Sequence, residues 1–326
     1  MAYPQNRPRR MRRTAALRTL LRETSLIPSD LIAPLFVKEG IDQPLPIASM
    51  PGQFQHSLES LAKEAREITS RGVIGFVLFG VPERKDDEGS EAWNPDGIAQ
   101  RGLRALRDEL GEDHVLIADL CLDEYAAHGH CGVLGPDGAV DNDRTVERYR
   151  RIAVTQAEAG ADLVAPSGMM DGQVAAIRAA LDDAGFAERT GILAYAAKFA
   201  SCFYGPFRDA AECAPAFGHR AGYQQDPANG DEALREIAAD IEEGADIVMV
   251  KPALPYLDVI RRAKDRFTTR LAAFNVSGEY AMVKAAGQNG WLDERRATLE
   301  VLTSIRRAGA DLILTYHAKD AAEWLG

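Results

Sequence analysis

Short apolar runs alternate along the chain with stretches of helical spacing. Residues 31–37 are almost continuously apolar, and residues 58–71 carry apolar side chains at Leu61, Ala65 and Ile68. Spacings of three and four residues predict a helix with one buried face, whereas a short apolar run predicts a strand covered on both faces. The alternation recurs and predicts eight strands, at residues 31–37, 73–79, 115–120, 162–166, 192–198, 247–250, 271–276 and 312–316.

A short sequence recurs at three of the predicted junctions between a helix and a strand. The copies are Ala159-Gly-Ala-Asp-Leu-Val, Glu243-Gly-Ala-Asp-Ile-Val and Ala308-Gly-Ala-Asp-Leu-Ile. Each places a glycine where a helix ends, because glycine readily adopts the left-handed conformation of a helix terminus. Eight such units predict a single (β/α)8 TIM barrel over residues 29–326. A doubly wound open sheet is the alternative, which the lack of a glycine-rich phosphate turn after the first strand disfavours.

Composition and charge limit the partners of this chain. A formal net charge of -11 over 326 residues argues against nucleic acid as the main partner. The chain has no apolar run of about 18 residues and no apolar segment after its first arginines, so we expect neither a membrane span nor a signal peptide. Residues 1–28 form a predicted basic arm, with five arginines between Arg7 and Arg13. A cytoplasmic location is expected, which leaves the cysteines for metal binding or catalysis.

Reactive side chains stand where the predicted strands end. The carboxyl ends of the strands in such a barrel meet at one face, and active sites lie there. The residues at these ends are Asp119 with Cys121, Ser167, Lys198, Lys251, Ser277 and Tyr316. A barrel built only for stability would not require such a set.

Two of these residues are lysines that follow consecutive strands. Burial removes the hydration of an ammonium group, so we expect the pKa of Lys198 to fall. Lys251 would add repulsion between two like charges, and one or both lysines would then reach the neutral form that attacks carbonyl groups. The alternative is that both stems pack inward while both charged groups reach water. The interpretation that we favour is Schiff-base formation with a ketone or an aldehyde.

A candidate metal site begins at the end of the third strand. Cys121-Leu-Asp123 and His128-Gly-His-Cys131 bring together thiol, carboxyl and imidazole groups. These ligands suit zinc, and three of them with an open position are typical of a catalytic zinc site. The alternative is that Cys121 fills space and the loop is merely polar. Cys202 and Cys213 lack such neighbours, and we interpret them as small apolar residues.

A long segment without strong periodicity follows the first lysine, and residues 199–225 form a predicted active-site lid. The lid carries Arg208, Arg220 and Gln224. Guanidinium groups bind carboxylates through paired hydrogen bonds, so a lid with two arginines suggests that an acidic substrate is captured as the lid closes. Ordinary surface arginines are the alternative.

Five longer motifs are spread over almost the whole chain. They are Asp119-Leu-Cys through His128-Gly-His-Cys-Gly132, Ala165-Pro-Ser-Gly-Met-Met-Asp-Gly172, Tyr195-Ala-Ala-Lys-Phe-Ala-Ser-Cys-Phe-Tyr-Gly-Pro-Phe-Arg-Asp209, Met249-Val-Lys-Pro252 and Val276-Ser-Gly-Glu-Tyr-Ala-Met282. Together they resemble the porphobilinogen synthase family, also called 5-aminolevulinate dehydratase. The resemblance implies a (β/α)8 barrel that condenses two molecules of 5-aminolevulinate into porphobilinogen, the first pyrrole of tetrapyrrole and haem biosynthesis.

The resemblance also implies a role for each matching residue. Lys251 would form the Schiff base with the first substrate, and Lys198 with the second. The substrate-binding residues that it implies are Asp119 and Ser167 for the first amino group, Ser277 and Tyr316 for the first carboxylate, Arg208, Arg220 and Gln224 for the second carboxylate, and Tyr204 in the pocket wall.

The metal loop departs from the family pattern. Zinc-dependent members have three cysteines here, whereas members without catalytic zinc have aspartate or alanine; this chain has Cys121, Asp123 and Cys131. The resemblance then implies a hybrid zinc site, completed by water or His130, in which the carboxylate weakens the preference for zinc. Glu236 matches a position that holds an allosteric magnesium ion in many members. A homo-octamer is implied as well, with the basic arm around a neighbouring subunit.

Two other functions fit parts of this pattern. A class I aldolase would need one catalytic lysine, and the metal loop would be incidental. A zinc-organised scaffold would bind partners through the basic arm and would need neither Lys198 nor Lys251. The scaffold predicts that Lys198→Ala and Lys251→Ala have no effect, whereas deletion of residues 1–13 abolishes function.

Overall fold

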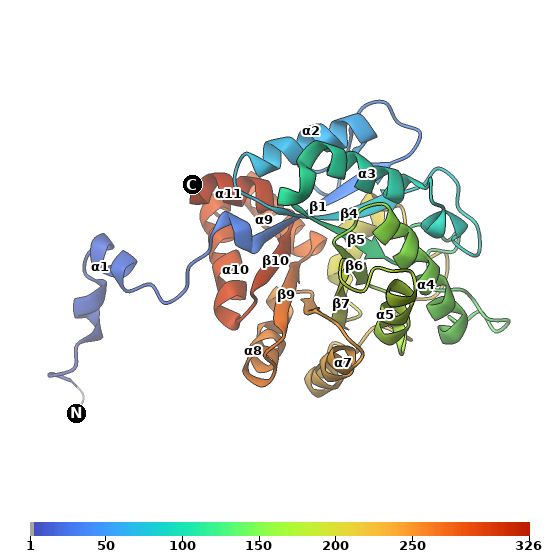
Figure 1. Ribbon diagram of the computed structural model, residues 1–326. Coiled ribbons are helices and arrows are strands. Elements are labelled where there is room, and N and C mark those ends of the chain that lie inside the picture. Colours follow the sequence, from blue (N-terminus) through green and yellow to red (C-terminus); the bar gives the residue numbers. More distant parts are fainter. Residues whose placement is uncertain (1–2) are drawn as a thin grey trace.

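The computed structural model describes residues 3–326, and within them a closed barrel of eight parallel strands forms the centre (Figure 1). The barrel is closed because β1 pairs with β4 on one side and with β10 on the other. The strands are β1 (Leu31–Lys38), β4 (Gly75–Val81), β5 (Val115–Leu120), β6 (Leu163–Pro166), β7 (Gly191–Lys198), β8 (Ile247–Lys251), β9 (Arg270–Asn275) and β10 (Leu312–Thr315). The predicted (β/α)8 barrel is confirmed, and each of these strands overlaps a predicted one.

Helices surround the barrel and cover the outer face of its strands (Figure 1). They are α2 (Leu58–Thr69), α3 (Ile98–Leu110), α4 (Asn142–Glu158), α5 (Gln173–Asp183), α7 (Gly230–Glu242), α8 (Leu257–Arg266), α9 (Ser277–Gln288), α10 (Glu294–Ala308) and α11 (Ala318–Leu325). The buried residues of α2 are Leu61, Ala65 and Ile68, the three that the spacing predicts. The repeated glycines Gly160 and Gly244 have φ angles of 98° and 106°, which confirms their left-handed conformation after α4 and α7.

Side chains of each strand alternate between two apolar layers. In β1, Phe36 belongs to the cluster inside the barrel, and its neighbours Leu35 and Val37 belong to the cluster between strands and helices. Both faces of a strand are thereby buried, which explains why the strands read as continuous apolar runs. The inner cluster also includes Tyr204 and Phe207 from the segment after β7 and Tyr316 just after β10, so it extends to the carboxyl ends of the strands.

Some elements were not predicted from the sequence. A hairpin of β2 (Leu45–Pro46) and β3 (Phe54–His56) is added next to β1. Helix α9 begins immediately after β9, so two helices instead of one precede β10. Glycines and mixed polarity in α9 obscure its periodicity. No helix in residues 3–326 combines the length and apolar character needed to cross a membrane.

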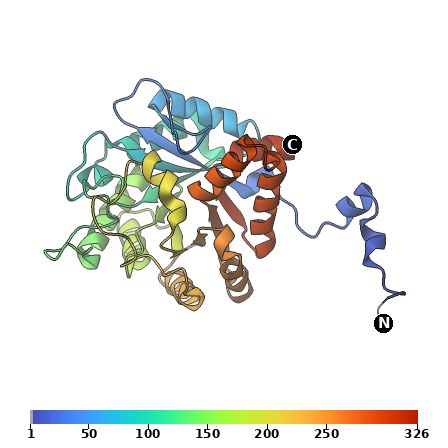
Figure 2. The ribbon, with the colours of Figure 1, turned by 180° about the vertical axis from the view of Figure 1, so that it is seen from behind.

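The N-terminal segment extends away from the barrel in both views (Figures 1 and 2). It contains the 3-10 helix Pro8–Arg12 and helix α1 (Ala15–Leu20), neither of which has a buried residue. The first two residues of the predicted basic arm lie outside the described residues. The arm therefore exposes apolar side chains, such as Leu20 with 79% of its surface accessible, beside its arginines.

The predicted lid consists of a short 3-10 helix (Cys202–Tyr204), helix α6 (Gly205–Ala210) and the irregular segment that follows. Its two ends are joined at the mouth of the barrel, because Gln225 N donates to Lys198 O at 3.0 Å and Ala200 N donates to Gln225 O at 2.8 Å. A segment anchored at both ends can position its side chains over the strand ends.

A glycine beside the metal loop provides a test of the packing. A Cβ atom at Gly168 would lie 1.7 Å from the hydroxyl oxygen of Tyr149, which is itself fully buried. We expect Gly168→Ala to lower the free energy of unfolding by about 1–3 kcal/mol, because a tightly packed core resists added volume. Urea unfolding measures the change, with Gly205→Ala as a control, since no atom lies within 4 Å of a Cβ there. Equal stability of the two variants would contradict the packing.

Candidate active site

Lys198 and Lys251 face each other across β7 and β8, as the last residue pair of that parallel ladder. Only 4% and 5% of their surfaces are accessible. A register shift between Ala194 and Ala197 places one extra residue in β7. Side chains alternate along a regular strand, so with Tyr195 facing inward Lys198 would face the helices. The extra residue changes the alternation by one position, and Lys198 then faces the interior of the barrel.

Aromatic rings surround the amino group of Lys251. Its Nζ lies 4.4 Å from the ring centre of Phe274, 4.9 Å from that of Tyr195, and 5.3 Å from those of Tyr204 and Phe207. Such rings attract a cation but provide no hydrogen-bond acceptor comparable to water. Among these rings, Tyr195, Phe207 and Phe274 were not singled out in the sequence. Tyr195 and Phe274 lie within apolar strand runs and Phe207 lies on α6, and an aromatic residue in such a run was the available signal.

The two lysines differ in their titration. Burial and the charge of Lys198 lower the pKa of Lys251 to about 7. Burial also acts to lower the pKa of Lys198, but the nearby Cys131 and Cys121 sulfurs and Asp123 outweigh it, and the pKa is raised. The prediction that the pKa of Lys198 falls was therefore wrong, because acidic groups from the loop after β5 lie next to it. Lys251 is the lysine that reaches the neutral form near neutral pH.

Asp119 and Ser167 lie together beside Lys198. Ser167 Oγ donates to Asp119 Oδ2 at 3.2 Å, and Lys198 Nζ donates to the carbonyl oxygen of Ser167 at 2.6 Å. Burial raises the pKa of Asp119 to about 6, although the charges of both lysines act to lower it. Within residues 3–326, Oδ1 of Asp119 has no hydrogen-bond partner. This oxygen can accept a hydrogen bond from a bound molecule.

Three further predicted residues lie near the strand ends, and two of them connect these ends to the lid. Tyr204 OH donates to the carbonyl oxygen of Lys251 at 3.1 Å. Ser277 Oγ accepts a hydrogen bond from Phe207 N at 3.0 Å and donates to Phe203 O at 3.3 Å. Tyr316 belongs to the inner cluster, where its ring stacks on that of Phe36. The structure thus brings these residues to the same mouth of the barrel as the lysines.

The remaining lid residues carry buried donors that lack acceptors. In the part of the chain that the structure describes, no partner exists for Nε of Arg208, Nε of Arg220 or Nε2 of Gln224. Buried donors are rarely left without a partner, because an unpaired one costs about 1–3 kcal/mol. These N–H groups are suited to an anionic ligand with several acceptor oxygens.

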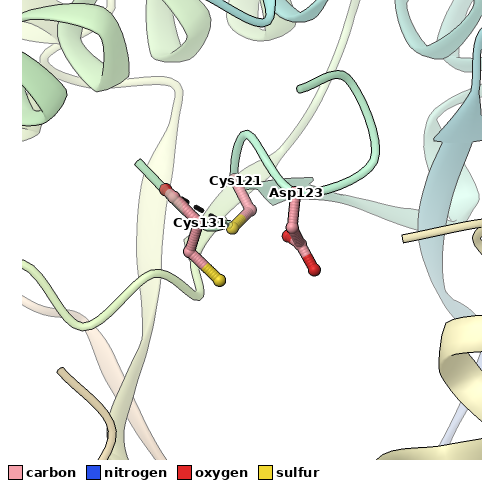
Figure 3. Close-up of side chains that lie close together, drawn as sticks. All are labelled: Cys121, Asp123 and Cys131. Atoms are coloured by element: carbon pink, nitrogen blue, oxygen red, sulfur yellow. Dashed lines mark hydrogen bonds between the residues drawn. The ribbon is translucent and has the colours of Figure 1, made fainter. Parts of the chain in front are cut away.

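Cys121, Asp123 and Cys131 form a buried cluster after β5 (Figure 3), and one ligand atom from each lies within 4.8 Å of the others. Cys121 Sγ donates to the carbonyl oxygen of Cys131 at 4.0 Å. A separate interaction between the two thiol groups lowers the pKa of Cys131, whereas burial raises that of Cys121. Two sulfurs and a carboxylate at this spacing fit a divalent ion such as zinc.

Asp123 also forms a buried ion pair, in which Arg220 Nη1 lies 2.8 Å from its Oδ2. Burial acts to raise the pKa of Asp123, but the charges of Arg220 and Lys198 outweigh it and hold the pKa below its usual value. The second amino group of Arg220, Nη2, donates to the carbonyl oxygens of Gly129 and Cys213 at 2.9 and 2.8 Å. The metal cluster and the lid therefore share one carboxylate.

Two other predicted metal ligands lie apart from the cluster. Both ring nitrogens of His130 are engaged elsewhere, with Tyr223 OH and Phe217 O, each at 3.1 Å. Glu236 lies half-buried on α7 and lines a cavity of about 670 Å³ next to the lid. Burial and neighbouring carboxylates raise its pKa. Among residues 3–326, Glu236 belongs to no group of three close metal-binding side chains.

One acidic residue beside the cluster was not predicted from the sequence. Glu124 is 2% accessible, and neither carboxyl oxygen has a hydrogen-bond partner in residues 3–326. Burial and the charges of Asp123 and Asp119 raise its pKa well above the usual value. Its position next to Asp123 was its only signal in the sequence.

Comparisons with known proteins agree with this geometry. Residues 5–324 match the family described as Delta-aminolevulinic acid dehydratase. The protein of that name from Mycobacterium tuberculosis is 58% identical over 326 residues, which cover 99% of this chain and 98% of the relative. The one from Bacillus subtilis is 51% identical over 325 residues, with 100% and 99% coverage.

A solved structure of the same kind comes from Toxoplasma gondii. It is a delta-aminolevulinic acid dehydratase (porphobilinogen synthase) in complex with the reaction product porphobilinogen. It superposes with a TM-score of 0.96 at 48% identity and covers 99% of this chain and 92% of its own. These matches extend over the whole barrel and include both lysine-bearing strands. The chain belongs to the delta-aminolevulinic acid dehydratase family of enzymes.

Proposed function

We propose that the protein condenses two molecules of 5-aminolevulinate into porphobilinogen, with loss of water, through Schiff bases on Lys251 and Lys198. The observation that carries this proposal is the pair of buried lysines opposite each other at the ends of β7 and β8. The relative from Toxoplasma gondii, which binds porphobilinogen as its reaction product, supports the substrate and the product. Haem and other tetrapyrrole biosynthesis is the corresponding pathway.

The lysines perform the covalent chemistry in this proposal. The neutral amine of Lys251 attacks the ketone carbon of the first substrate, and water leaves as the imine forms. Once the ammonium group of Lys198 has lost a proton, its amine forms an imine with the ketone of the second substrate, and water leaves again. Each protonated imine accepts electron density from the adjacent carbon, which allows bonds to form between the two substrates. Asp119, with a pKa of about 6, is suited to accept and return protons beside them.

Polar groups around the lysines orient the two substrates. Asp119 and Ser167 bind the amino group of the first substrate, and Ser277 with Tyr316 binds its carboxylate. The second carboxylate binds to the lid, where Arg208, Arg220 and Gln224 offer N–H groups that lack protein acceptors. Tyr204 forms part of the pocket wall, and its hydroxyl group donates a hydrogen bond to the backbone carbonyl oxygen of Lys251.

Zinc is the metal that we propose for Cys121, Asp123 and Cys131, with water at the open position. The hydrogen bonds that already occupy His130 favour water over this side chain. A bound zinc ion would supply a Lewis acid at the site of the second substrate. We also propose that Glu236 binds magnesium, because its position matches one that holds an allosteric magnesium ion in many family members.

Assembly as a homo-octamer is proposed from the exposed arm and from the family. The backbone of residues 3–22 extends away from the barrel (Figure 1). Apolar and basic side chains of this segment are exposed, and a neighbouring acidic subunit would cover them. Cytoplasmic location, and the absence of nucleic acid and membrane partners, remain predictions from composition.

Borohydride trapping tests the function directly. Incubation with 5-aminolevulinate and borohydride should leave a reduced adduct on Lys251 and on Lys198, located by peptide mass mapping. Lys251→Ala and Lys198→Ala should each lower kcat at least roughly a thousandfold. Lys38→Ala is the matched control, because Lys38 also ends a strand but pairs with Glu212. Absence of both adducts in the unmodified protein would refute the proposed function.

The pH dependence should follow the titration of Lys251. Attack needs the neutral amine, and the pKa of about 7 means that this form increases as the pH rises through neutrality. The initial rate of trapping on Lys251 should therefore rise between about pH 6 and 8 and then level off. Asp119→Asn removes a charge that raises the pKa of Lys251, so the rise should move to lower pH. A rise centred near the ordinary pKa of lysine would contradict the assignment.

Zinc binding should depend on the cluster and not on cysteine content. Cys131→Ala should weaken zinc binding by about tenfold or more, because it removes the thiol whose pKa is lowered. Competition with a chromophoric chelator measures the affinity. Cys213→Ala is the control, since Cys213 is equally buried but lies outside the cluster. Equal zinc affinity of both variants would exclude the proposed site, and full activity without zinc would exclude a catalytic need for it.

A further inference from the structure

Glu279 is a buried carboxylate that none of the roles above uses. It lies in the first turn of α9, within the motif that begins at Val276, and only 1% of its surface is accessible. Burial raises its pKa to about 7, although backbone amides that bind it act in the opposite direction. A buried carboxyl group is costly unless hydrogen bonds compensate for the lost water, so its partners indicate its purpose.

The two carboxyl oxygens of Glu279 bind two separate places, the residue that precedes its own helix and the segment after β8. Oε2 accepts a hydrogen bond from Val276 N at 2.5 Å, and Oε1 accepts one from Leu254 N at 2.6 Å. The first bond is local: Glu279 reaches back from the first turn to the backbone N–H of Val276, the residue before α9, as the glutamate of a capping box does. The second bond joins residues that are 25 positions apart in the chain. A simple helix cap does not require it.

The second bond stands where the sheet itself provides no connection. On the β7 side, the ladder of β8 continues to Lys251, whose carbonyl oxygen also accepts hydrogen bonds from Phe199 N and Tyr204 OH. On the β9 side, pairing stops at Val250 and Ala273. Pro252 follows Lys251 and has no N–H group to extend that pairing. Glu279 thus supplies the connection between the ends of β8 and β9.

We propose that Glu279 is a positioning residue, whose carboxylate holds the segment after Lys251 against the start of α9, where Ser277 is the first residue. This inference rests on the proposed function, in which these two residues bind the ketone and the carboxylate of the same first substrate. Their separation must match the length of that substrate, so one bridge between these segments fixes both contacts at once. The hydrogen bonds of Glu279 go to Val276 N and Leu254 N and not to Lys198, so we expect the bridge to affect the Lys251 adduct more than the Lys198 adduct.

Trapping with 5-aminolevulinate and borohydride, resolved for each lysine, tests the inference. Glu279→Gln keeps the shape but can accept at only one oxygen. We expect the ratio of the Lys251 adduct to the Lys198 adduct at subsaturating substrate to fall by about tenfold or more, because small displacements strongly reduce attack. Asp293→Asn is the matched control, since Asp293 caps α10 through Arg296 N and contacts neither segment.

The outcomes separate the inference from the proposed function. If the protein without substitutions carries no adduct on either lysine, the proposed function is refuted, whatever the variants show. If the unmodified protein is labelled and the ratio of adducts is unchanged in Glu279→Gln, the inference is overturned. Glu279 would then act only as a helix cap, and its replacement would lower only the melting temperature, as we expect for Asp293→Asn. If Glu279→Gln does not fold, the ratio in Glu279→Asp decides in the same terms, because the shorter carboxylate cannot span both amides.

Discussion

Two lysine side chains inside one barrel impose the constraint on which the rest of this structure depends. Each ammonium group loses its hydration, and the two repel each other across β7 and β8. The residues around each lysine compensate for this loss of hydration and this repulsion to different extents. Aromatic rings around Lys251 leave its charge weakly supported, whereas acidic groups and a carbonyl oxygen support that of Lys198. One buried pair thereby contains one amine that is ready to react and one that must first lose a proton.

The acidic groups that support Lys198 are shared with two neighbouring functions. Asp123 is at once a member of the metal cluster, the ion-pair partner of Arg220 and a source of negative charge for Lys198. A third cysteine at this position would leave Arg220 without its carboxylate. Asp123 therefore joins the loop after β5 to the segment that carries Arg220, so replacing this aspartate would have consequences beyond metal binding.

The sequence predicted the barrel well because burial on both faces leaves a strong pattern. Apolar runs such as residues 115–120 and the glycines at Gly160 and Gly244 mark strand and helix boundaries directly. The lysines and the metal cluster were found because their residue types are unusual at strand ends. Properties that depend on neighbours from other strands could not be found in this way. The raised pKa of Lys198 and the partners of Arg220 and Glu279 arise from residues that are distant in sequence.

The bulge in β7 has a consequence for how such a site can change over time. A single extra residue between Ala194 and Ala197 decides whether Lys198 faces the interior or the helices. Substitutions near the bulge can change the pKa of the Lys198 amine gradually. Insertion or deletion of one residue, in contrast, moves this side chain from one face of the strand to the other in one step. The length of this strand, more than the identity of its residues, separates a barrel with two interior amines from a barrel with one.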